Sequence, residues 1–192
     1  MDEPIGAVVL GHGAGGGVQA RDLVATAEAA RSLGFAVALV EQPYRVAGRR
    51  SPAPAPRLDA AWTQVVEQLR ADALDGLPLV VGGRSSGARV ACRTAAATEA
   101  IAVICLAFPL HPPARGRPRP SRLPELDAVA QPTLVVQGAS DSFGMPPSAA
   151  QRRVVTVAGG HALTSDLGAV AEAVRGWLVD VVIPTVPARR GR

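Results

Sequence analysis

Short apolar runs alternate with amphipathic stretches along nearly the whole chain, and this alternation restricts the fold more than any other feature of the sequence. Strands that are apolar from end to end are buried on both faces, as in parallel sheets covered by helices. The pattern therefore predicts an α/β fold with a mostly parallel sheet of about six strands and helices on both faces. The six runs are Ile5–Leu10, Phe35–Val40, Leu77–Val81, Ile101–Leu106, Thr133–Val136 and Val154–Val157.

Four of the intervening stretches have helical spacing of their apolar residues. They are Val18–Leu33, Asp59–Leu74, Ser86–Thr98 and Leu167–Val182, and Gly34 is expected to end the first. Two Pro- and Arg-rich stretches, Pro43–Pro56 and Pro109–Pro124, are predicted to be loops. We expect one domain over residues 1–183, a flexible tail over residues 184–192, and no substantial lid.

The pentapeptide Gly83–Gly87 (GRSSG) follows the third apolar run and fits the pattern G-x-S-x-G. A serine hydroxyl is a useful nucleophile only when its oxygen projects into open space beside a base. A tight turn from strand to helix projects it, and flanking glycines tolerate the crowding. Ser85 is the predicted nucleophile, the alternative being that it only caps the helix. Ser86 is less suited because Arg84 stands where its flanking glycine would be.

A partner base and acid are expected later in the chain, in the order Ser, Asp or Glu, His. Asp141 follows the fifth run and His161 follows the sixth, so both lie at carboxyl ends of strands, where open α/β sheets bind ligands. Each could instead be an ordinary loop residue. Other acids fit less well: Asp166 is better placed to cap the last helix, and Asp127 precedes a strand.

The Gly-rich segment Gly11–Gly17 (GHGAGGG) follows the first apolar run. Beside a reactive serine it would be an oxyanion loop, in which a backbone N–H near Gly13 or Ala14 joins that of Ser86 in holding negative charge. His12 would orient this loop.

The same segment also reads as the dinucleotide-binding pattern G-x-G-x-x-G through Gly11, Gly13 and Gly16. Glu41, at the end of the next apolar run, would then be its acidic residue; otherwise Glu41 is structural or lines the pocket. A dinucleotide-binding domain explains the glycines but leaves the serine elbow unexplained.

Composition argues against several other functions. All 20 basic residues are Arg, against 16 acidic residues, and aromatic residues make up 3% of the chain, too few for a base-stacking surface. We expect no nucleic-acid partner. Cys92 and Cys105 lie among apolar neighbours and resemble buried hydrophobic residues, and no Cys/His cluster suggests a metal. With no signal peptide or apolar run long enough to cross a bilayer, the protein is expected to be cytoplasmic.

Five segments together resemble the α/β-hydrolases, and within them the small dienelactone-hydrolase-like members. The resemblance is greatest to the hydrolase-like family that includes a testis-expressed protein and a subunit of a histone acetyltransferase complex. The segments are LGHGAGG at 10–16, GGRSSGARVA at 82–91, FPLHPP at 108–113, LVVQGASDSFG at 134–144 and GGHAL at 159–163. The antiparallel strands that open a full-length sheet of this kind are not evident.

The resemblance implies Ser85 as nucleophile, Asp141 as acid, His161 as base, and oxyanion donors at Ala14 and Ser86. It implies a serine hydrolase that cleaves an ester or similar acyl bond of a small molecule through an acyl-enzyme intermediate, without metal or cofactor. The alternative is a non-catalytic interaction module on the same scaffold.

The candidate pocket residues come from several loops. Leu110 and Phe143 would form apolar walls, and Arg84 would meet an anionic group. His111 either lines the pocket or is a loop residue fixed by its flanking prolines. Gly13 and His12 complete the predicted set.

Overall fold

The computed structural model describes residues 3–112 and 119–186 and contains a six-stranded sheet in which every neighbouring pair of strands is parallel. The strands are β1 (Gly6–Gly11), β2 (Phe35–Val40), β3 (Leu79–Arg84), β4 (Ala102–Leu106), β5 (Thr133–Gly138) and β6 (Arg152–Val157). Each contains or overlaps one of the six apolar runs. The predicted parallel sheet is confirmed.

The sheet order is β2-β1-β3-β4-β5-β6. From β1 the chain moves outward to β2, then crosses back over β1 to β3 and continues outward in the opposite direction. The carboxyl ends of β1 and β3 are therefore adjacent although β2 lies between them in sequence. Loops leave in opposite directions at such a point, which opens a crevice for ligands.

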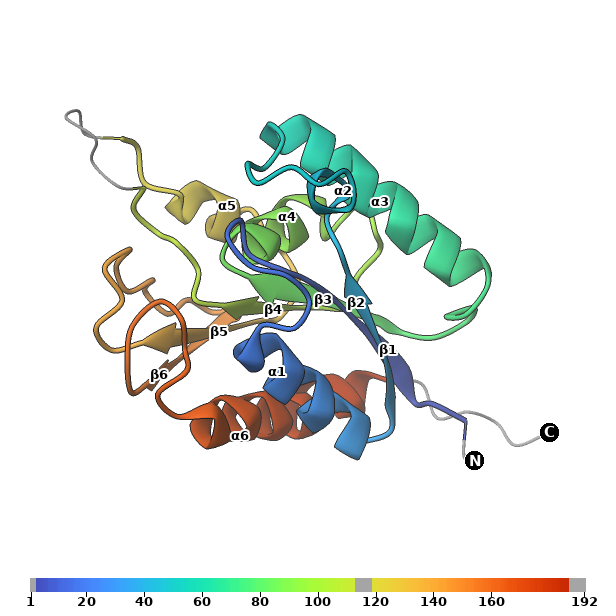
Figure 1. Ribbon diagram of the computed structural model, residues 1–192. Coiled ribbons are helices and arrows are strands. Elements are labelled where there is room, and N and C mark those ends of the chain that lie inside the picture. The colour runs from blue at the N-terminus through green and yellow to red at the C-terminus, as the bar shows by residue number, and fades with distance from the viewer. Residues whose placement is uncertain (1–2, 113–118, 187–192) are drawn as a thin grey trace.

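Helices cover both faces of the sheet (Figure 1). On one face lie α1 (Arg21–Ser32) and α6 (Leu167–Trp177); on the other lie α2 (Pro43–Val46), α3 (Ala55–Ala71), α4 (Ser86–Thr94) and α5 (Leu123–Asp127). Each face has its own apolar core, and the two cores contain Trp177 of α6 and Trp62 of α3, respectively. Between β4 and β5 the only helix among the described residues is the five-residue α5, so the described part of this connection contains no lid domain.

Several predicted boundaries are corrected by the structure. The predicted loop Pro43–Pro56 contains α2 and the start of α3, and the loop Pro109–Pro124 runs into α5. In all three helices a proline occupies one of the first two positions, where its missing N–H costs no hydrogen bond. The loop predictions, which rested on proline content, were therefore wrong where the prolines begin helices.

The ends of three predicted helices also differ. α1 begins at Arg21 rather than Val18, after a turn in which the N–H of Ala20 donates to Gly17 O, and Gly34 with φ +88° follows its last turn. α4 ends at Thr94, four residues early, and α3 ends at Ala71.

The C-terminal helix is regular only to Trp177. It continues as a π-helical turn over Leu178–Val182 and a 3-10 turn over Ile183–Thr185. The predicted tail 184–192 is thus ordered at its start, because Ile183 and Val186 pack against the α1/α6 core. Its remaining residues, from 187, lie outside the described part of the chain.

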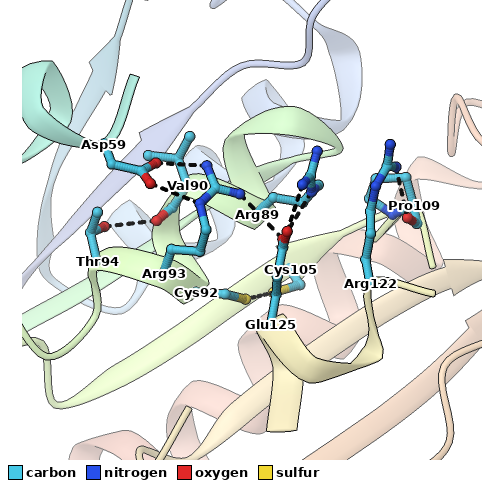
Figure 2. Close-up of polar contacts among 10 residues, drawn as sticks. All are labelled: Asp59, Arg89, Val90, Cys92, Arg93, Thr94, Cys105, Pro109, Arg122 and Glu125. Atoms are coloured by element: carbon cyan, nitrogen blue, oxygen red, sulfur yellow. Dashed lines mark hydrogen bonds and ion pairs between the residues drawn. The ribbon is translucent and has the colours of Figure 1, made fainter. Parts of the chain in front are cut away.

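An ion-pair network joins α3, α4 and α5 on one face (Figure 2). Arg93 of α4 makes a two-pronged contact with Asp59 of α3 and also reaches Glu125 of α5, while Arg89 donates to both oxygens of Glu125. We call these four residues the α3–α5 clamp. Their side chains are 20–25% exposed, so the pairs are partly shielded from water.

Cys92 and Cys105 lie directly beneath this clamp, as predicted buried and free, with their sulfur atoms 3.4 Å apart. The thiol–thiol contact and burial raise the pKa of Cys105 well above its usual value. Both thiols therefore act as small apolar core groups.

Candidate active site

Ser85 occupies the sharp turn between β3 and α4, with φ +52° and ψ −106°. A non-glycine residue pays a conformational cost in this region, and surrounding contacts must hold it there. Its N–H donates to Leu106 O at the end of β4. The capping interpretation is not supported, because Ser85 makes no side-chain cap hydrogen bond to α4.

The glycines of the pentapeptide are required by close packing against the end of β1. A Cβ at Gly83 or Gly87 would overlap the carbonyl oxygen of Gly11, and one at Gly87 would also lie 2.9 Å from His12 O. The amino end of α4 is therefore pressed against the β1 loop. This brings the partial positive charge of the helix N-terminus to the serine.

The Gly-rich loop lies beside Ser85 and is held by Gln42, just before α2, and by Tyr44 of α2. A Cβ at Gly13 would be 3.4 Å from Ser85 Cβ. The fully buried ring of His12 bonds Gly13 O through Nδ1 at 2.8 Å and accepts the N–H of Gln42 at Nε2 at 3.0 Å. These bonds identify Nδ1 as the protonated nitrogen. His12 therefore orients the loop and does not line an open pocket.

Tyr44 supports the same loop from α2, since its hydroxyl donates to Ala14 O at 3.1 Å. Burial raises the pKa of Tyr44, so the hydroxyl remains a donor. The backbone N–H groups of Ala14 and Ser86 make no hydrogen bond within the described residues. Two unused donors thus lie on the two segments that flank the serine.

Ser85, His161 and Asp141 form one hydrogen-bonded chain. His161 Nε2 lies 2.9 Å from Ser85 Oγ, and His161 Nδ1 lies 2.9 Å from Asp141 Oδ2. The His161 side chain is 22% exposed, whereas that of Asp141 is 1% exposed. The structure brings the three side chains together from the ends of β3, β5 and β6, at the edge that the sequence indicated.

Arg84 is not available to a ligand in the way predicted. Its Nε lies 2.8 Å from Asp22 Oδ2, and its Nη2 donates to His161 O at 3.0 Å. A Cβ at Gly13 would lie 2.8 Å from its Nη1, so the guanidinium is enclosed between the Gly-rich loop and the His161 loop.

Asp22, on the first turn of α1, is the partner that sequence reasoning missed. Burial raises its pKa, and the charge of Arg84 lowers it only in part. Without Asp22, the Arg84 side chain, which is only 17% exposed, would carry a largely buried charge with no carboxylate partner. In the sequence, the signal was that Asp22 is an acidic residue on a side of the predicted helix that is otherwise mostly apolar.

Phe143 and His111 belong to neighbouring loops at the same edge. The Phe143 ring lies against the His161 ring with centroids 4.4 Å apart and an interplanar angle of 42°. His111 donates its N–H to Phe143 O at 2.8 Å, and its exposed ring contacts Gly144. Leu110 is 5% exposed and belongs to the core beneath the loop rather than to an open wall.

The acidic residues that were not predicted as the partner of His161 have other positions and contacts. Asp166 caps α6 by accepting from the N–H of Ala169 at 2.8 Å, as predicted. Asp127 pairs with Arg152 at the other end of the sheet. Glu41 is exposed beside the Gly-rich loop.

Gln137 of β5 is the other functional candidate that the sequence reasoning missed. Its Nε2 donates to Asp141 Oδ2 at 2.8 Å. The signal was present: it is a polar residue in a strand (TLVVQG) whose other large side chains are apolar and buried.

Within residues 3–112 and 119–186, no group of three or more His, Cys, Asp or Glu side chains is arranged to hold a metal ion. No helix in the same part of the chain is long and apolar enough to cross a membrane.

The sheet order, the serine turn and the residues that meet there define an α/β hydrolase, and comparison with known families agrees. The chain matches the alpha/beta hydrolase domain family over residues 4–165 and belongs to it. This membership decides against the dinucleotide-binding interpretation of the Gly-rich loop.

Solved structures of the same fold include a lidless α/β serine hydrolase from Xanthomonas campestris. It has a TM-score of 0.76 and 22% identity, and the match covers 99% of this chain and 86% of that one. Est1E from Butyrivibrio proteoclasticus matches with a TM-score of 0.70 and 19% identity, over 93% and 88% of the two chains. A dienelactone hydrolase from Anabaena variabilis matches with 0.71 and 19%, over 92% and 86%. Among curated protein sequences, none matches significantly.

Proposed function

We propose that this protein is a serine hydrolase that cleaves an ester or similar acyl bond of a small molecule through an acyl-enzyme intermediate. The observation that carries the proposal is the continuous chain from Ser85 Oγ through the His161 ring to Asp141, with both links at 2.9 Å. Ser85 is the nucleophile, His161 the base, and Asp141 the acid that orients it.

In the acylation step, Ser85 Oγ attacks the substrate carbonyl carbon while its proton passes to His161 Nε2. Asp141 holds the proton on Nδ1, which keeps Nε2 free to accept, and stabilises the imidazolium that forms. Collapse of the tetrahedral intermediate breaks the acyl bond, and His161 returns the proton to the leaving group. In the second step, a water molecule gives a proton to His161 and attacks the acyl-enzyme in the same way. The carboxylic acid product then leaves Ser85.

The negative charge on the former carbonyl oxygen is assigned to the N–H groups of Ala14 and Ser86. Two observations support this assignment. The two N–H groups lie on segments that pack together at Gly13 and Gly87, and neither makes another hydrogen bond within the described residues. Removing one such donor typically costs about 3–4 kcal/mol of transition-state stabilisation.

The substrate class is proposed to be small acyl compounds that reach an open site. In support, His161 is partly exposed, no lid domain occurs in the described chain, and Phe143 offers an apolar ring beside the base. Ferulic acid has been seen bound to Est1E, which shares the fold. Esters of aromatic or short aliphatic acids are therefore the first compounds to screen.

The test is labelling with a fluorophosphonate probe, followed by mass spectrometry of the modified peptide. We expect label on Ser85, no label in Ser85→Ala, and a loss of at least about 100-fold in rate in His161→Ala, which lacks the base. Ser86→Ala is the matched serine control, because its N–H is retained, and it should still be labelled.

Absence of label from folded wild-type protein at high probe concentration would overturn the proposal. The alternative, a non-catalytic interaction module on this scaffold, would then explain the fold better.

A further inference from the structure

Gln137 lies near the carboxyl end of β5, and its side chain is fully buried. Its neighbours Val135 and Val136 are equally buried and belong to the two apolar cores. Placing an amide among them costs free energy unless the amide is well hydrogen-bonded. The contacts of this amide therefore indicate why it is there.

The amide nitrogen is surrounded by three oxygens. Gln137 Nε2 lies 2.8 Å from Asp141 Oδ2, 2.9 Å from Gly144 O and 3.1 Å from Phe108 O. Three acceptors define the orientation of the side chain, since a flipped amide would point its oxygen at three other oxygens. The amide oxygen has no partner within the described residues. The side chain thus serves as a donor alone.

The acceptor that matters most is Asp141 Oδ2, because His161 Nδ1 bonds the same oxygen. The other oxygen, Oδ1, accepts the N–H of Phe143. Gln137 and Phe143 together fix the plane of the carboxylate. Gln137 therefore determines where the acceptor of the His161 proton lies.

The contact with Gly144 O adds a second effect. Phe143 rests on the His161 ring, and Gly144 follows it with φ +90°. Gln137 thus holds both the carboxylate and the loop that carries the ring-stacking residue.

We propose that Gln137 is a positioning residue that acts through Asp141 to keep His161 aimed at Ser85. The inference rests on the proposed serine hydrolase function. Packing alone does not need an amide: Met has nearly the same size, fits an apolar strand and leaves no unpaired oxygen.

The first test uses two substitutions of similar shape. Gln137→Met removes the donor, and Gln137→Glu replaces it with an acceptor that repels Asp141. We measure the rate of reaction with the fluorophosphonate probe, and kcat and KM for p-nitrophenyl acetate. Gln137→Met should lower the labelling rate and kcat about 10- to 100-fold, by analogy with the loss of a hydrogen-bond partner behind a metal ligand. KM should change little, and Gln137→Glu should lose more than Gln137→Met.

A double-mutant cycle tests whether the effect passes through Asp141. In an Asp141→Ala background, Gln137→Met should change the labelling rate by less than about 3-fold, since residues that act as one unit are not additive. The control is Gln151→Met, the same substitution at an exposed side chain just before β6, at the amino ends of the strands and away from the site. This variant should react as fast as wild type.

The outcomes separate this inference from the proposed function. If wild type is not labelled, the proposed function fails. If wild type is labelled and folded Gln137→Met reacts equally fast, or if its loss is undiminished in Asp141→Ala, only the role of Gln137 is overturned. Circular dichroism checks folding; should Gln137→Met not fold, Gln137→Asn, whose amide is too short to keep the contact with Asp141, replaces it with the same expectations.

Discussion

Ser85 is held in a backbone conformation that it would not adopt alone, and the cost is met by packing around it. The glycines at 83 and 87 allow the start of α4 to approach the end of β1 so closely that no side chain fits between them. The serine turn and the Gly-rich loop are therefore packed together as one unit. A change in either should alter both.

Gly87→Ala tests this coupling. The added Cβ would overlap Gly11 O, so we expect a loss of about 3 kcal/mol or more in the free energy of unfolding, together with loss of fluorophosphonate labelling. Urea denaturation measures the first and mass spectrometry the second. Gly176→Ala in α6 is the control: a Cβ there meets nothing within 4 Å, and alanine should stabilise the helix by about 0.5–1 kcal/mol. Equal effects at the two positions would contradict the packing argument.

At the same scale, the sequence indicated the three residues of the hydrogen-bonded chain but not those that support them. Ser85, Asp141 and His161 stand out because they follow strands at the ligand-binding edge. Gln137, Asp22 and Tyr44 lie inside elements, where the sequence pattern gives no information on what a side chain meets. Their partners come from distant segments, so only the folded arrangement identifies them.

Among the elements, α5 is too short to be stable by itself and depends on contacts with its neighbours. It has five residues, and Glu125 links it to both Arg89 and Arg93 of α4. Arg122, just before the helix, donates to Pro109 O, and burial lowers its pKa. The α3–α5 clamp thus holds α5 against α4, and the Arg122 contact holds the start of α5 near Pro109.

Glu125→Gln should lower the free energy of unfolding by about 1–2 kcal/mol, because it removes the charge that two partly buried guanidinium groups share. Glu172→Gln is the matched control: Glu172 pairs with Arg175 on the surface and is 71% exposed, so its loss should cost less than about 0.5 kcal/mol. Urea denaturation in low and high salt measures both. A clamp variant no less stable than the control variant would refute the role of the network.

All six strands were predictable because short, continuous apolar runs separated by amphipathic stretches are typical of strands buried on both faces of a parallel sheet. The helices that were missed, α2 and α5, are short and proline-initiated, and their stability comes from tertiary contacts such as those of Glu125. Helix ends were misjudged where a cap or turn, rather than apolar spacing, decides the last residue. The loss of regular α-helix after Trp177 had no signal in the sequence.

For the whole molecule, the expectation of a single domain can be tested with the two tryptophans, one in each apolar core. In Trp62→Phe only Trp177 reports, and in Trp177→Phe only Trp62 reports. Because both cores are built on the same sheet, unfolding followed by fluorescence should coincide with unfolding followed by circular dichroism within each variant. Separate transitions in either variant would indicate that the two faces unfold independently.

The two edges of the sheet differ in a way that bears on how copies of the molecule meet. β6 forms one edge and carries the exposed Arg153, whereas β2 (FAVALV) forms the other edge and has no charged residue. Charged side chains on an outer strand discourage a further strand from adding, and an uncharged apolar strand does not. β2 is therefore the edge more open to pairing with a strand of another copy, and it is the place for a charge intended to prevent such pairing.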